Sequence, residues 1–109
     1  MNILHRFLIG KWYDEINTGT KREEYFDMKW IPRICAYVTS CPQRCRHTGE
    51  PCRHGNVPTN YTHICFHRGY TKTTMLWKIE NVTIGTGNPE WGAPIMEPVV
   101  IVKLNKRET

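Results

Sequence analysis

Apolar and polar positions at the start of the chain change from a strand-like to a helix-like pattern. Residues 3–9 read as a short strand, and Trp12 and Ile16 then recur at the spacing of one helical turn. Gly19 follows at a position where glycine commonly ends a helix in the left-handed conformation. The pattern therefore predicts a strand over 3–9 and a helix over about 11–18.

The remainder of the chain favours strands. Residues 21–26 look extended, whereas residues 30–35 allow either a short helix or a loop, because Pro32 is tolerated only in a first helical turn or outside regular structure. Runs of β-branched and aromatic residues predict three further strands, over 62–68, 73–84 and 99–104. More strand than helix, without βαβ alternation, predicts an α+β domain built on a small curled sheet or barrel.

A long loop-like segment interrupts this pattern at about 39–62. Prolines and glycines break every regular period there: Pro42, Gly49, Pro51, Gly55 and Pro58. The segment is also rich in cysteine, arginine and histidine. We interpret it as an insertion in a single domain that spans residues 1–109, because a chain of this length forms one hydrophobic core.

The composition narrows the class of protein. Apolar residues make up 39% of the chain and charged residues 23%, which excludes a collagen-like fibre, a coiled coil and a disordered tail. The longest aliphatic run, residues 99–102, is far shorter than the roughly 18 residues of a membrane helix. Residues 1–10 have no features of a secretory leader, so we expect a cytoplasmic protein with no membrane association.

The net charge of +5 is concentrated in the middle of the chain. Residues 28–72 hold seven Lys and Arg residues against the single acidic residue Glu50, a balance of +6. Arginine-rich stretches suit phosphate recognition, so this segment favours RNA or a nucleotide as partner; the alternative is a solvated basic loop. The candidate phosphate contacts within the segment are Arg33, Arg44, Arg46, Arg53 and Arg68.

The five cysteines favour reduced thiols over disulfides, because their number is odd and no export signal is expected. Three of them, Cys41, Cys45 and Cys52, lie within twelve residues and could bind a structural zinc ion. Cys65 is the first choice as fourth ligand. The other candidates for this position are Cys35, His47 and His54. A metal-free loop is the alternative.

The segment after Gly19 carries the most distinctive charge pattern. If residues 21–26 form a strand, Lys21 and Glu23 share one face and Arg22 and Glu24 share the other. A lysine held near a glutamate in a pocket is suited to proton transfer or to gripping a nucleotide. The alternative is an exposed edge of alternating charges.

This segment also resembles a known family. Gly19, Lys21 and Glu24 form the pattern G-x-K-x-x-E, which is similar to the signature of the ASCH domain, a branch of the PUA-like superfamily. Other segments agree with that family in order along the chain: residues 30–33, 67–70, 75–84 and 85–94. The resemblance is to the short single-domain ASCH proteins of bacteria and their phages. It implies a small curled antiparallel β-barrel of about five strands, with one or two short helices.

The resemblance further implies a cleft between barrel and helix that binds RNA or a nucleotide. Lys21 and Glu24 would lie in this cleft and Arg33 and Arg68 would meet phosphates, while a base would stack on an aromatic ring, namely Tyr70, Trp30 or Trp91. The family also predicts an enzyme as an alternative: a hydrolase of modified nucleosides, or a small ribonuclease. Its catalytic residues would be Lys21 with Glu24 or Glu90.

Two departures from the family pattern bear on these functions. Phe26 stands where the family usually has an arginine, and Glu24 stands where the hydrolase branch has a threonine. A third alternative is therefore a phage-type protein-interaction module whose cysteine-rich loop docks on a protein partner.

Overall fold

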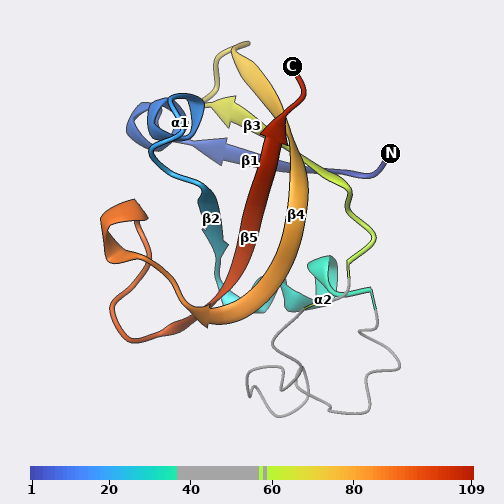
Figure 1. Ribbon diagram of the computed structural model, residues 1–109, viewed down its shortest axis with the longest axis vertical. Coiled ribbons are helices and arrows are strands. Elements are labelled where there is room, and N and C mark those ends of the chain that lie inside the picture. The colour runs from blue at the N-terminus through green and yellow to red at the C-terminus, as the bar shows by residue number, and fades with distance from the viewer. Residues whose placement is uncertain (37–56, 58) are drawn as a thin grey trace.

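The computed structural model describes residues 1–36, 57 and 59–109. Within these residues it contains five strands, two short α-helices and two 3-10 turns (Figure 1). Their bounds in chain order are β1 Ile3–Leu8, α1 Gly10–Asn17, β2 Glu23–Phe26, η1 Met28–Trp30, α2 Ile31–Ile34, β3 His63–Arg68, β4 Thr74–Thr86, η2 Pro89–Trp91 and β5 Pro98–Arg107. The predicted strands and the first helix are confirmed to within a few residues. Of the two alternatives for residues 30–35, a short helix or a loop, the structure has a helix over 31–34.

The five strands form one mixed sheet in the order β1-β3-β4-β5-β2. Three pairings are antiparallel, β3 with β4, β4 with β5 and β5 with β2, whereas β1 and β3 are parallel. The expectation of an antiparallel barrel is thus wrong for the first strand. The reason is the connection: the chain crosses over through α1, β2 and α2 before it returns as β3, and such a crossover permits parallel pairing.

The long strand β4 gives the sheet its curl. It pairs with β3 over its first residues and with β5 along its length, and its register shifts twice, between Trp77 and Ile79 and between Ile79 and Asn81. Such irregularities bend a strand and increase its twist. Figure 1 shows the result, a sheet curved like half of a barrel. The strand order leaves β1 and β2 as the two edges of the sheet.

The concave side of the sheet encloses the hydrophobic core. Inward-facing strand residues pack there with Tyr13 and Ile16 of α1 and with Ile31 and Ile34 of α2. The best-buried strand residues in this cluster are Leu4, Phe26, Ile64, Phe66, Met75, Val100, Val102 and Leu104. No helix in the described part of the chain has the length and apolar character needed to cross a membrane.

Candidate functional site

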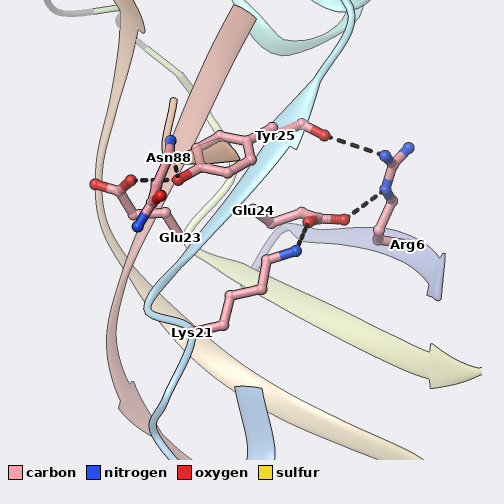
Figure 2. A network of polar contacts seen from close by, with 6 residues as sticks. All are labelled: Arg6, Lys21, Glu23, Glu24, Tyr25 and Asn88. Carbon is pink, nitrogen blue, oxygen red and sulfur yellow. Dashed lines mark hydrogen bonds and ion pairs between the residues drawn. The ribbon is translucent and has the colours of Figure 1, made fainter. Parts of the chain in front are cut away.

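Arg6 joins the two edges of the sheet. Its Nε donates a hydrogen bond to Oε2 of Glu24 over 2.8 Å, and its Nη2 donates to the carbonyl oxygen of Tyr25 over 3.1 Å (Figure 2). The guanidinium also lies over the ring of Phe26, 4.4 Å from the centroid, at a distance that favours a cation–π interaction. A side chain of β1 therefore connects to β2 across the opening of the half-barrel.

Lys21 and Glu24 form a buried ion pair beside this contact. Lys21 Nζ donates to Glu24 Oε1 over 2.8 Å, and the two side chains are only 2% and 4% exposed. The preceding turn is held by Gly19, whose φ of 83° suits glycine, and by the Lys21 N–H, which donates to the carbonyl oxygen of Glu15. Glu24 thus accepts hydrogen bonds from two cations, Lys21 and Arg6. The three side chains together have a formal charge of +1.

The prediction that Lys21 shares a strand face with Glu23 is wrong. β2 begins only at Glu23, so Lys21 lies in the turn before the strand, where strand alternation does not apply. Glu23 instead accepts a hydrogen bond from the Tyr25 hydroxyl over 2.8 Å. The alternative of an exposed charged edge is also wrong for Lys21 and Glu24, because both are buried.

A cavity of about 230 Å³ lies against the ion pair. It is lined by charged and aromatic side chains, among them Arg6, Trp12, Lys21, Glu24, Tyr25 and Trp91. Lys21 Nζ lies 4.6 Å from the centroid of the Trp12 ring and 5.8 Å from that of Tyr25. The half-buried ring of Trp12 packs against the hydrophobic core and also forms part of the cavity wall. The cavity therefore combines cationic donors with flat apolar surfaces.

Tyr25 anchors the loop that carries Trp91. Its hydroxyl donates to Glu23 and accepts a hydrogen bond from the Asn88 N–H over 3.0 Å (Figure 2). Burial and, to a smaller extent, the Glu23 carboxylate raise the pKa of Tyr25 above its ordinary value, against the opposing effect of the Asn88 N–H. The phenol therefore stays protonated and holds β2 to the start of η2.

Tyr25 is expected to limit the stability of the protein in alkali. Above pH of about 10 the tyrosine of the unfolded chain ionises while the folded phenol keeps its proton, so the free energy of unfolding falls as the pH rises. In urea denaturation, the free energy of unfolding of Tyr25→Phe should decrease less steeply above pH of about 10 than that of the wild type. At neutral pH the variant should be less stable by about 1–2 kcal/mol, because its hydrogen bonds are missing. Tyr70→Phe is the control, because Tyr70 is exposed and its loss should leave the pH dependence unchanged. If the free energy of unfolding decreased equally steeply with pH in Tyr25→Phe and in the wild type, Tyr25 would not be the cause.

Gly87 lets this loop approach Tyr25 closely. A Cβ at Gly87 would lie 2.6 Å from Tyr25 Cε1 and 2.7 Å from Cβ of Ala93. We expect Gly87→Ala to lower the free energy of unfolding by about 1–3 kcal/mol, as overpacking commonly does. Gly85→Ala is the matched control, since its Cβ would meet Ile101 at an ordinary 3.8 Å. Equal thermal stability of the two variants would show that the loop adjusts without strain.

The structure separates several predicted site residues from the cavity. Arg33 is exposed on α2 and lies over the ring of Trp30, and both are outside the cavity lining. Glu90 is exposed on η2, and its side chain does not line the cavity although the next residue, Trp91, does. The catalytic role predicted for Glu90 stays a prediction.

Two other predicted contacts lie nearer to the cavity. Arg68 forms an ion pair with Asp14 and lies against Gly10, the residue after Ile9 of the cavity wall. Tyr70 is 97% exposed, and its ring centroid is 5.6 Å from that of Phe7, which also lines the cavity. The remaining candidates lie outside the described residues: Arg44, Arg46, Arg53, Cys41, Cys45, Cys52, His47 and His54.

Cys65 lies close to two histidines in the part of the chain that the structure describes. Cys35 belongs to the hydrophobic core, whereas Cys65 and His67 lie on β3 beside His5 of β1, and one ligand atom from each of these last three residues lies within 4.8 Å of the other two. Burial raises the pKa of Cys65, and burial together with His5 lowers the pKa of His67. These three side chains could hold a metal ion.

No protein-family model, curated protein or solved structure matches this chain. The resemblance to ASCH domains therefore stays a prediction. The geometry nevertheless identifies site residues that sequence reasoning missed, chiefly Arg6 and Tyr25. Arg6 lies on the same face of β1 as the buried residues Leu4 and Leu8. A charged residue on the inward face of a predicted strand is the signal that could have identified it.

Proposed function

We propose that this protein binds single-stranded RNA or a free nucleotide by accepting one base in the cavity beside Lys21 and Glu24, as expected of a PUA-like ASCH domain. The observation that carries the proposal is the buried ion pair in the wall of a ring-lined cavity. Taking two charges out of water costs several kcal/mol per ion, and buried ion pairs add little net stability. A role in recognition accounts for the pair better than a role in folding.

The hydrogen-bonding capacity of the pair supports this role. An ammonium group has three N–H donors, and within the described residues Lys21 Nζ donates only to Glu24. Donors thus remain for a carbonyl oxygen of a base or for a phosphate oxygen. The excess positive charge of Arg6 and Lys21 over Glu24 favours the same electron-rich groups.

The size and lining of the cavity favour a single base. At about 230 Å³ it is smaller than the roughly 300–1,000 Å³ of sites for drug-sized ligands, so it suits one ring system. The rings of Trp12, Tyr25 and Trp91 line the cavity, and stacking of a base on an aromatic ring contributes about 1–3 kcal/mol. A paired base inside a duplex could not enter, whereas an unstacked base could.

An exposed aromatic ring extends the proposed binding surface beyond the cavity. Phe7 lines the cavity, and the exposed ring of Tyr70 lies beside it with the two ring planes tilted by 34°. The net charge of +5 and the arginines predicted to meet phosphates, Arg44, Arg46 and Arg53, would add a sequence-independent attraction that salt weakens.

Fluorescence anisotropy with a labelled RNA strand tests the proposal. We expect the single strand to bind, free nucleotides to compete, and the affinity to fall linearly in a plot of log K against log salt. A duplex of the same length should bind much more weakly. Equal binding of duplex and single strand, without competition by nucleotides, would contradict the use of the cavity. Turnover of a nucleoside would instead favour the hydrolase, and no nucleic-acid binding at all would favour the protein-interaction module.

A further inference from the structure

We infer that His5, Cys65 and His67 form a zinc site that fastens the edge strand β1 to β3. The three ligands lie outside the lining of the proposed nucleotide cavity and differ from the predicted ligands Cys41, Cys45 and Cys52. The inference rests on the register of the two strands and on the geometry of three donor atoms.

Parallel pairing of β1 and β3 brings the three side chains together. His5 lies opposite Cys65, and Phe7 lies opposite His67. Because residues 64 and 66 are fully buried, the alternating residues 65 and 67 both face the outer side of the sheet, where His5 is exposed. One strand thus supplies a Cys-x-His pair on a single face, and its neighbour supplies the second imidazole.

The donor atoms are already close to the arrangement that an ion requires. His5 Nδ1 and His67 Nε2 are 3.0 Å apart, and Cys65 Sγ lies within 4.8 Å of a ring nitrogen of each histidine. Around a tetrahedral zinc ion such donors lie about 3.3–3.6 Å apart, given bond lengths near 2.0 Å to nitrogen and 2.3 Å to sulfur. Small side-chain rotations therefore suffice. The ring of His67 is further held by stacking on Phe7, with centroids 4.4 Å apart and planes 16° apart.

The chemistry of the donor set selects the ion. Two imidazoles and one thiol suit zinc or a similar borderline-soft ion, whereas calcium and magnesium require oxygen ligands. On binding, the Cys65 thiol loses its proton to solvent and the thiolate bonds to the ion, while both imidazoles coordinate through neutral nitrogen atoms. Three protein ligands leave a fourth tetrahedral position for water or another donor.

The site would stabilise the strand that carries part of the cavity wall. Among the described strands β1 pairs only with β3, and Arg6 and Phe7 of β1 line the cavity. An ion shared between His5 on β1 and two residues on β3 adds a cross-link to this edge. Zinc should therefore raise the melting temperature of the protein, as any ligand of the folded state does.

Cobalt provides a spectroscopic probe of this site. A variant with Cys41, Cys45 and Cys52 all changed to Ser removes the thiols of the predicted cluster and serves as the background. We expect Co²⁺ to bind it with a thiolate charge-transfer band, and Zn²⁺ to displace the Co²⁺ at one ion per chain. Absence of this band in the background variant would overturn the inference.

Single substitutions in this background locate the ligands. Cys65→Ser should abolish the band, and His5→Gln or His67→Gln should weaken metal affinity more than about 100-fold, because even residues that only hydrogen-bond to a metal ligand contribute about 10- to 100-fold. His63→Gln is the matched control: it lies on β3 but bonds to Thr62. Circular dichroism verifies folding, and His5 is exposed, so its variant is expected to fold. Unchanged affinity in His5→Gln, or an equal loss in His63→Gln, would overturn the inference.

Discussion

Replacing Lys21 by Met is expected to lower the affinity for a nucleotide by about 30- to 150-fold. The substitution keeps much of the side-chain volume but removes the ammonium group of a residue that lines the cavity. A hydrogen bond from a charged group contributes about 2–3 kcal/mol, and each 1.4 kcal/mol corresponds to a factor of ten in affinity. Isothermal titration with a nucleotide, or anisotropy with a short RNA, measures the change.

Lys103→Met is the control for the loss of one positive charge. Lys103 is exposed on β5 and pairs with Glu80, away from the cavity. We expect it to change affinity by less than a factor of about three, through long-range attraction that salt screens. An equal effect of both variants would mean that Lys21 acts only through net charge, and the proposed contact with a base would be wrong.

Glu24→Gln is expected to have the largest effect on stability, a loss of about 3–5 kcal/mol in the free energy of unfolding. Glu24 is the shared acceptor of Lys21 and Arg6, both at 2.8 Å. Without its charge the buried ammonium has no counterion among the residues that the structure describes, and the link between β1 and β2 weakens. Urea denaturation at pH 7 measures the difference between the variant and the wild type.

Two comparisons show whether the loss of stability in Glu24→Gln comes from the burial of Glu24 and from its position between two cations. Glu80→Gln removes a carboxylate from an exposed pair with Lys103 and should cost less than about 1 kcal/mol. Lys21→Met should cost less than Glu24→Gln, because Glu24 keeps Arg6 as a partner. If Glu24→Gln were no more destabilising than Glu80→Gln, the carboxylate could not be the centre of the group.

Local pattern was sufficient to predict most elements of the fold. The helical spacing of Trp12 and Ile16 and the cap at Gly19 are short-range signals, and α1 ends close to the predicted position. The parallel pairing of β1 and β3 was not predictable in this way, because it depends on a crossover between segments far apart in the sequence. The cluster of His5, Cys65 and His67 depends on this same pairing, so no local pattern indicates His5, and the sequence alone groups Cys65 with Cys41, Cys45 and Cys52.

The candidate site was predictable only in part, for a similar reason. The motif pointed to Lys21 and Glu24, and the structure brings them together. Strand alternation instead predicts that Lys21 shares a face with Glu23, because the sequence pattern does not mark the turn that precedes β2. The contribution of Arg6 arises from the curl of the sheet, which brings its two edges close, and curl follows from bulges in β4 that the sequence does not mark.

Nitrogen-15 NMR of the four tryptophan indoles tests the central claim most directly, because each indole N–H reports on its own surroundings. Trp12 and Trp91 line the cavity, whereas Trp30 and Trp77 do not. On addition of a nucleotide we predict large shifts for the indole signals of Trp12 and Trp91 and small ones for the other two, with Lys21→Met suppressing the response. A nucleotide that binds but shifts only Trp30 or Trp77 would contradict the account.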